Sequence, residues 1–148
     1  MKRALLLLLV AGSAWAGDHG ERRAAPANAT YADECGACHL AYPPALLPAA
    51  SWQRLMGDLP HHYGADASLD PRVAASLAVW LDANASRRRG EAPPDDRITR
   101  SRWFVHEHDE VPAGAWKRAS VKSPSNCTAC HEGAARGDFS EHAVRIPR

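Results

Sequence analysis

The sequence contains the pattern C-x-x-C-H twice, as CGACH at residues 35–39 and as CTACH at residues 127–131. This pattern is the attachment signature of a c-type haem. Two thiols three positions apart can form thioether bonds to one porphyrin, and the histidine that follows can supply an imidazole to the iron. All four cysteines of the 148-residue chain belong to the two copies. We therefore expect two covalent c-type haems, held by Cys35, Cys38, Cys127 and Cys130, with His39 and His131 as proximal iron ligands.

Three other uses of a C-x-x-C pair fit the sequence less well. A thioredoxin-type pair follows a β-strand, and no run of β-branched residues precedes either copy. A zinc ribbon spaces its pairs about 15–20 residues apart, whereas 88 residues separate Cys38 from Cys127. Plain disulfides in an oxidising compartment are the third alternative. Two haems are favoured because a chain with 4 cysteines and 8 histidines would rarely contain the five-residue pattern twice by chance.

The first 16 residues have the pattern of a cleaved export signal. Lys2 and Arg3 form a positive start, an apolar run rich in leucine covers residues 4–12, and residues 14–16 read A-x-A. The apolar run is shorter than the roughly 20 residues that span a bilayer. We place the cleavage after Ala16, and no second apolar stretch of spanning length follows. The sequence therefore predicts a periplasmic protein that does not itself span the membrane.

The charge balance argues against a nucleic-acid partner. The whole chain has 18 Lys and Arg against 17 Asp and Glu, a formal net charge of +1. Loss of Lys2 and Arg3 with the signal would change this to 16 against 17, or −1. No basic stripe of the kind that binds nucleic acid is present.

The mature chain is short for two haem sites. Removal of 16 of 148 residues leaves 132, or about 66 for each haem, and a core of that size alone is marginal. We expect each haem to act as a large apolar part of the core, so that the apoprotein is poorly folded.

Proline positions and apolar spacing predict the local structure of the chain. Prolines at 43–48 predict an extended loop, and the apolar spacing predicts two helices, at 52–59 with Ser51 as its cap and from Pro71 to near Asn84. The second half is less regular, with a helix from Thr99 to about His108 and a short one after His131. Composition divides the chain into five segments. They are a signal peptide (1–16), a flexible leader (17–30), an N-terminal haem domain (31–84), a solvated linker (85–97) and a C-terminal haem domain (98–148).

Each iron has a sixth position to fill. Met56 is the one methionine left after cleavage, and it lies on the apolar stripe of its helix, which favours a packing role. At most one haem can therefore have His/Met ligation. The spacing leaves His61 and His62 open for the first haem, and it leaves three residues open for the second, His106, His108 and His142. His19 lies in the leader, where we expect it to be solvated.

Much of the mature sequence resembles the diheme cytochrome c family of bacterial periplasmic electron carriers. The matching segments are residues 34–39, 42–44, 46–48, 67–70, 103–104, 107–111, 123–131, 137–139 and 145–148, of which the tail from 126 to 148 is the most specific. The resemblance implies a mainly α fold, with a class I cytochrome c-like N-terminal domain and a small, largely irregular C-terminal domain. It implies His62, before an aromatic-Gly pair, and His108, within EHDE at 107–110, as the distal ligands.

The resemblance also implies a carrier of electrons that is not an enzyme. Its expected partners are other redox proteins, among them an oxygen-binding monohaem cytochrome and a membrane b-type cytochrome. The alternative is a haem enzyme or gas-binding protein, peroxidase-like or oxygen-binding, with one open iron site. Coordination number separates the two hypotheses, because an enzyme or gas binder needs a vacant or exchangeable sixth position.

Overall fold

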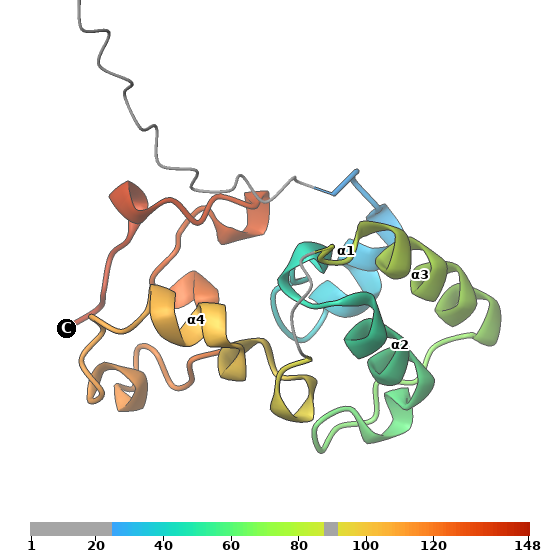
Figure 1. Cartoon of the computed structure of the whole chain (residues 1–148), viewed down its shortest axis with the longest axis horizontal. Coiled ribbons are helices and arrows are strands. Elements are labelled where there is room, and N and C mark those ends of the chain that lie inside the picture. The colour runs from blue at the N-terminus through green and yellow to red at the C-terminus, as the bar shows by residue number, and fades with distance from the viewer. Residues whose placement is uncertain (1–24, 88–91) are drawn as a thin grey trace, which may run out of the picture.

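The computed structural model describes residues 25–87 and 92–148 of the chain. Within those residues the regular structure is helical, and β-pairing is limited to isolated bridges such as Pro48 with Ser86. The prediction of a mainly α fold is therefore confirmed. Figure 1 shows the three longer helices gathered in one half of the molecule, and α4 with the short 3-10 turns that follow it in the other. The predicted signal peptide and residues 17–24 of the predicted leader lie outside the described residues.

Two of the three N-terminal helices begin at side-chain caps. Helix α1 (Ala29–Gly36) starts where Asn28 Oδ1 accepts the Tyr31 amide at 3.0 Å. Helix α3 (Pro71–Asn84) starts where Asp70 accepts the amides of Arg72 and Val73. The predicted α3 is confirmed. The predicted leader extends too far, because the Asn28 cap already places residues 29 and 30 in a helix.

Helix α2 (Ala49–Gly57) begins and ends earlier than the sequence predicts. Ser51 is not its cap. It is fully buried in the first turn, and its amide donates to the Pro48 carbonyl at 3.0 Å. Pro48 can stand directly before the helix, because its backbone is extended there and the helix needs no amide hydrogen from that position. Residue 59 belongs instead to the separate 3-10 turn η2 (Leu59–His61), which contains Pro60.

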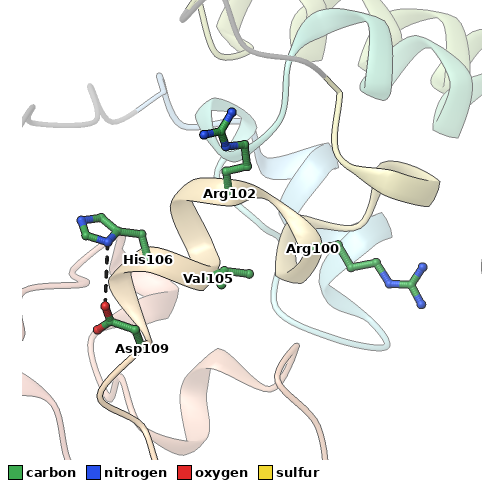
Figure 2. Close-up of a pocket in the computed structure, with 5 residues that line it drawn as sticks. All are labelled: Arg100, Arg102, Val105, His106 and Asp109. Atoms are coloured by element: carbon green, nitrogen blue, oxygen red, sulfur yellow. Dashed lines mark ion pairs between the residues drawn. The ribbon is translucent and has the colours of Figure 1, made fainter.

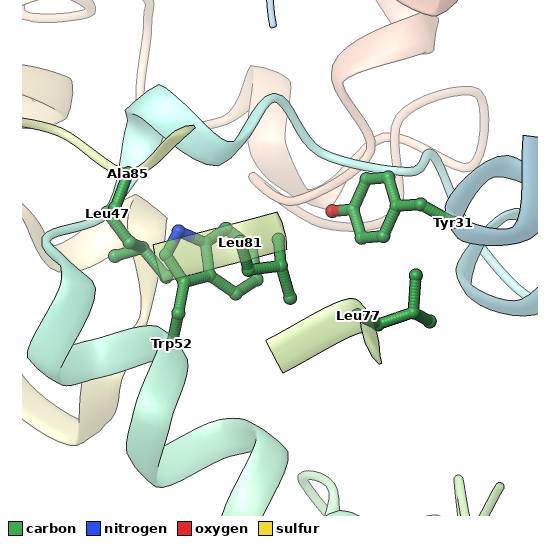
Figure 3. Packing of buried hydrophobic residues seen from close by; sticks show 6 residues of the cluster. All are labelled: Tyr31, Leu47, Trp52, Leu77, Leu81 and Ala85. Atoms are coloured by element: carbon green, nitrogen blue, oxygen red, sulfur yellow. The ribbon is translucent and has the colours of Figure 1, made fainter. Parts of the chain in front are cut away.

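The core of the N-terminal half lies between α1, α2, α3 and the segment before α2. Figure 3 shows its six buried residues, Tyr31, Leu47, Trp52, Leu77, Leu81 and Ala85. The three leucines are each 1% exposed, and full burial of each contributes about 1.5–3 kcal/mol. Met56 packs against this cluster from the side, as expected for a packing residue.

The segment 42–48, which includes the predicted loop at 43–48, is joined to this core by two side-chain hydrogen bonds. The Trp52 indole donates to the Pro44 carbonyl at 2.7 Å, and the Tyr31 hydroxyl donates to the Tyr42 carbonyl at 2.6 Å. The sequence predicts an extended loop here, but the segment contains the 3-10 turn η1 (Pro44–Leu46) and is therefore only partly extended. A 3-10 turn begins readily at a proline, which has its φ angle already set.

The C-terminal half is largely irregular, as predicted. Its α4 (Arg102–Glu107) is shorter than the helix expected from Thr99, because Ser101 interrupts the segment. Ser101 has an extended backbone, and its Oγ accepts the Phe104 amide at 3.2 Å as the helix cap. The remaining regular structure is a set of 3-10 turns, of which η7 is the short helix predicted after His131: η4 (Ile98–Arg100), η5 (Ala115–Lys117), η6 (Cys127–Ala129), η7 (Ala134–Arg136) and η8 (Glu141–Ala143).

The segment expected to be a solvated linker is partly packed. Residues 88–91 lie outside the described part of the chain. After them, Pro93 is buried, and η3 (Pro94–Asp96) lies against α2. Arg54 of α2 donates to both carboxylate oxygens of Asp96, at 2.6 and 2.8 Å. The expectation of full solvation is wrong here, because Asp96, one of the residues that suggested it, pairs with Arg54 of the N-terminal half.

Candidate haem-binding sites

The first site is formed by two histidines that face each other. The ring centres of His39, in the first C-x-x-C-H motif, and His62, just after η2, are 6.1 Å apart, with the ring planes at 21°. Imidazoles that bind one metal ion from opposite sides have ring centres about 6 Å apart, because each bond is about 2 Å long and each centre lies about 1 Å beyond its nitrogen. The spacing of His39 and His62 therefore fits a single iron between them.

The second site repeats this spacing with another pair. His131 of the second motif and His108, at the end of α4, also have ring centres 6.1 Å apart, but their planes are at 75°. The C-terminal tail holds this motif in place, since the Arg145 amide donates to the Cys130 carbonyl at 2.9 Å and residue 144 bridges His131. The chain thus builds two histidine pairs of equal spacing in two different local folds.

One histidine of each pair is anchored by the main chain. Nδ1 of His39 donates to the Leu40 carbonyl at 2.7 Å, and Nδ1 of His108 donates to the Phe104 carbonyl at 2.9 Å. Since a carbonyl can only accept, each Nδ1 carries a proton, and the other ring nitrogen keeps the lone pair that a metal needs. The His108 ring also stacks on Phe104, with centres 4.0 Å apart.

The other histidine of each pair has a buried Nδ1 without a hydrogen-bond partner, in His62 and in His131. Burial lowers the pKa of both imidazoles, and the facing histidine lowers it further. Asp138 opposes this effect at His131. The neutral imidazole is the form that binds iron, so burial favours the form of both residues that could act as a ligand.

The space around the second pair could hold a flat apolar group, and two thiols form part of its wall. A cavity separates α4 from the second motif, and Cys127 and Cys130 line it together with both histidines. Its other walls are mainly apolar and aromatic, and one of them, Leu46, comes from the N-terminal half. The rest are Ile98, Trp103, Phe104, Val111, Trp116, Phe139, Val144 and Ile146. Thiols, facing imidazoles and apolar walls are together what a covalently attached haem requires.

All four cysteines are free thiols, the form that can make thioether bonds to a haem. None of them forms a disulfide. Cys35 lies in the last turn of α1, while Cys38 is exposed beyond it. Burial raises the pKa of Cys35, Cys127 and Cys130, which keeps these thiols protonated near neutral pH.

The remaining candidate histidines lie away from both pairs. The His61 side chain is 80% exposed and contacts Asp58 through Nδ1 at 2.6 Å. His106 lies on the outer face of α4, where Figure 2 shows it paired with Asp109, at 3.9 Å. His142 is exposed on η8, and His19 is outside the described residues. Of the residues that spacing left open, the structure places His62 and His108 opposite the motif histidines.

Tyr42 joins the two sites and was not singled out from the sequence. Its ring stacks on His39, with centres 4.9 Å apart at 24°. Its hydroxyl donates to the Ser125 carbonyl at 2.7 Å, and the Cys127 thiol lies 3.7 Å from that same oxygen. Tyr42 follows the first motif by three residues, but only the tertiary structure brings residue 125 to it.

A helical fold with two C-x-x-C-H motifs, each opposed by a second histidine, defines a c-type cytochrome with two haem sites. A family model described as dihaem cytochrome c matches residues 31–139. The chain belongs to the dihaem cytochrome c family, and its cofactors are accordingly two c-type haems with iron.

Solved structures of this family resemble the chain over most of its length. A diheme cytochrome c from Shewanella baltica OS155 is 40% identical, with a TM-score of 0.74, and the match covers 82% of this chain and 94% of that one. DHC from Rhodobacter sphaeroides is 45% identical, with a TM-score of 0.69 and coverage of 77% and 98%. None of the curated protein sequences compared with the chain matches it. In residues 25–87 and 92–148, no helix has the length and apolar character of a membrane span.

Proposed function

We propose that the chain is a periplasmic electron carrier, not an enzyme, in which both haems have bis-histidine coordination. The first haem would be held by Cys35, Cys38, His39 and His62, and the second by Cys127, Cys130, His131 and His108. The observation that carries the proposal is the pair of histidine spacings, both 6.1 Å between ring centres. No other described histidine stands opposite a motif histidine in this way.

The residues around each pair support electron transfer rather than catalysis. The bound haem supplies one-electron chemistry at its iron. Each pair of histidines would hold its iron on both sides, which would leave substrate or gas no ready position to occupy. The carbonyls of Leu40 and Phe104 fix the orientation of one imidazole in each pair, which limits the change in geometry when charge changes. Two imidazoles also give a lower potential than the His/Met ligation that Met56 would provide.

The cellular setting follows from sequence features. The export signal at residues 1–16 supports a periplasmic location, where covalent haem attachment takes place. Other redox proteins are the expected partners, and the resemblance favours an oxygen-binding monohaem cytochrome and a membrane b-type cytochrome among them. Binding of either to the purified dihaem protein, measured by calorimetry, would test this part of the proposal.

Ligand substitutions test the coordination directly. The reduced wild type should take up carbon monoxide slowly or not at all, and both ferric haems should be low-spin. His62→Ala should open the first haem alone, and His108→Ala the second alone, because each removes one side of a pair. His61→Ala and His106→Ala are matched controls, since those side chains are exposed and lie outside the pairs. Rapid carbon monoxide uptake by the wild type would favour the enzyme or gas-binding alternative instead.

A further inference from the structure

The backbone directly after His62 is strained. Tyr63 has a φ of 52°, in the left-handed region that residues other than glycine, asparagine and aspartate rarely adopt. Gly64 follows with a φ of 97°, which glycine adopts without strain. A strained non-glycine residue persists only where its surroundings hold it. Something must therefore hold Tyr63, and with it the loop that carries His62.

Residues 95–97 hold the Tyr63 side chain. The Tyr63 hydroxyl donates to the Asp95 carbonyl at 2.9 Å, and the Arg97 guanidinium lies over the Tyr63 ring, 4.2 Å from its centre. The same ring contacts the His62 imidazole edge-on, with centres 5.0 Å apart. We call the contacts of Asp95 and Arg97 with Tyr63 the tyrosine clamp. It connects the segment that leads into the second half with the residue beside a proposed ligand of the first haem.

The tyrosine clamp is itself fixed from two sides. Arg54 of α2 binds Asp96 through two hydrogen bonds, and Arg100 of η4 forms an ion pair with Asp95. Asp95 and Asp96 have positive φ angles, 54° and 53°, which aspartate adopts more readily than tyrosine does. The position of Tyr63 therefore depends on the packing of residues 93–100 against the N-terminal half.

The two proposed distal ligands differ in what holds them. His108 is anchored within its own element, because its Nδ1 donates to the Phe104 carbonyl one turn earlier and its ring stacks on Phe104. The Nδ1 of His62 has no hydrogen-bond partner. Its backbone is held by the η2 turn before it and by the Ala65 amide, which donates to the His62 carbonyl at 3.0 Å, and its ring contacts Tyr63. His62 is thus the distal residue whose position depends on a contact with another part of the chain.

We propose that Tyr63 is a positioning residue that keeps His62 on the iron of the first haem. The tyrosine clamp then determines whether that haem admits an exogenous diatomic ligand. This inference rests on the proposed bis-histidine coordination. Without the clamp, His62 would be free to leave the iron, and a molecule such as carbon monoxide would bind in its place. The second haem stays closed, because His108 does not contact the clamp.

Substitutions at both partners of the clamp test the proposal in the full-length protein with both haems. Tyr63→Asn keeps a residue that tolerates the positive φ and removes the ring and hydroxyl. It should speed carbon monoxide uptake by the reduced first haem roughly tenfold or more, because a hydrogen bond and a cation–π contact are lost. Tyr63→Phe and Arg97→Gln each remove one contact and should have smaller effects in the same direction. Arg97→Lys should retain most of the wild-type behaviour.

Arg102→Gln is the matched control for Arg97→Gln, since Arg102 is an exposed residue of α4 (Figure 2) and takes no part in the tyrosine clamp. It should behave as the wild type. Intact mass establishes that each variant keeps two haems, and magnetic circular dichroism reports the spin state of the ferric haems. A high-spin fraction confined to the first haem in Tyr63→Asn, Tyr63→Phe and Arg97→Gln would support the clamp.

Two results would overturn the inference. One is that all three clamp variants keep two low-spin haems and the wild-type rate of carbon monoxide uptake, while His62→Ala opens the first haem. In that case the bis-histidine proposal stands and the clamp is wrong. The other is that the wild type is itself high-spin and takes up carbon monoxide rapidly, in which case both proposals are wrong. Because Tyr63→Phe and Arg97→Gln leave the backbone conformation compatible, they decide the matter even if Tyr63→Asn folds poorly.

Discussion

At the scale of single residues, Tyr42 has contacts in both halves of the molecule. It stacks on His39, while its hydroxyl donates to the Ser125 carbonyl next to the second motif. Burial raises the pKa of its phenol, so the hydroxyl keeps its proton and remains a donor at neutral pH. One side chain thereby fixes the first proximal histidine relative to the loop that carries Cys127.

Tyr42→Phe should remove the contact between the halves and keep the stack on His39. We expect the free energy of unfolding to fall by about 1 kcal/mol, because one hydrogen bond is lost and the Ser125 carbonyl is left for water. Guanidinium unfolding of the protein with both haems measures this. Tyr42→Leu should cost more, since it also removes the ring from His39. Equal stability of Tyr42→Phe and wild type would show that the hydrogen bond between the halves contributes nothing.

At the scale of elements, α3 forms one wall of the N-terminal core and depends on its cap. Asp70 Oδ1 accepts the amides of Arg72 and Val73, at 2.9 and 3.3 Å, and Pro71 occupies the first helical position. Leu77 and Leu81 then pack in the core. Fraying at the start of α3 would therefore loosen the wall against which Tyr31 packs.

Asp70→Ala should destabilise the protein by about 1 kcal/mol, the usual cost of losing such a cap. Thermal unfolding followed by far-ultraviolet circular dichroism measures the effect. Asp66→Ala is the matched control, because the Asp66 carboxylate bonds only to Ser68 in the preceding loop. A loss of stability in Asp66→Ala as large as in Asp70→Ala would mean that the helix cap is not the cause.

The ion pair between α2 and η3 makes stability depend on pH. Hydrogen bonding by the Arg54 guanidinium lowers the pKa of Asp96 below its usual value of 3.8, against a smaller opposing effect of burial. A carboxyl group whose pKa is lower in the folded state stabilises the protein above the unfolded pKa. That stabilisation is lost as the pH falls through the folded pKa.

We therefore expect Arg54→Gln to be less stable than wild type at pH 7 and equally stable at a pH well below 3.8. The difference should be modest, since the Arg54 side chain is half exposed and salt screens the pair. Urea unfolding at several pH values measures it. A difference that stayed constant down to the lowest pH would show that the Asp96 carboxylate is not the group responsible.

At the scale of the whole molecule, the two halves differ in how much core the polypeptide supplies. The N-terminal half has the six-residue cluster of Figure 3. Beyond residue 97, the buried hydrophobic residues are Phe104, Ala115, Val121 and Ala134, two of them alanines. The cavity between α4 and the second motif lies where a larger core would be expected. The second half therefore depends more strongly on its haem.

A variant with Cys127→Ala and Cys130→Ala should test this dependence. We expect it to lose the second haem and with it the protection of residues 98–148 against hydrogen exchange, while most of the N-terminal half stays protected. The reverse variant, Cys35→Ala with Cys38→Ala, should retain more structure in the half that loses its haem. Hydrogen exchange read by mass spectrometry distinguishes the halves. Full protection of residues 98–148 without the second haem would contradict the argument.

Much of this protein could be predicted from local sequence. The two C-x-x-C-H motifs predict the haems, because attachment needs only residues close in the chain. The start of α3 and the irregular second half were also predictable, since Asp70 and Pro71 act within one helical turn. The true starts of α2 and α4 were missed. A cap depends on the backbone angles of one residue, and Ser51 and Ser101 have opposite roles that local pattern does not distinguish.

Spacing did not decide which histidines face each other; the resemblance implied His62 and His108, and only the tertiary structure shows the packing that places them opposite His39 and His131. His61 and His62 are adjacent, and so nearly are His106 and His108, so spacing cannot choose between them. Packing can, because it turns His62 and His108 toward the motif histidines. It turns His61 and His106 toward exposed carboxylates, those of Asp58 and Asp109. The contacts of Tyr42 with residue 125 and of Tyr63 with residues 95–97 arise in the same way. They join segments distant in the chain, and such contacts depend on the free energy of the whole fold rather than on any local preference.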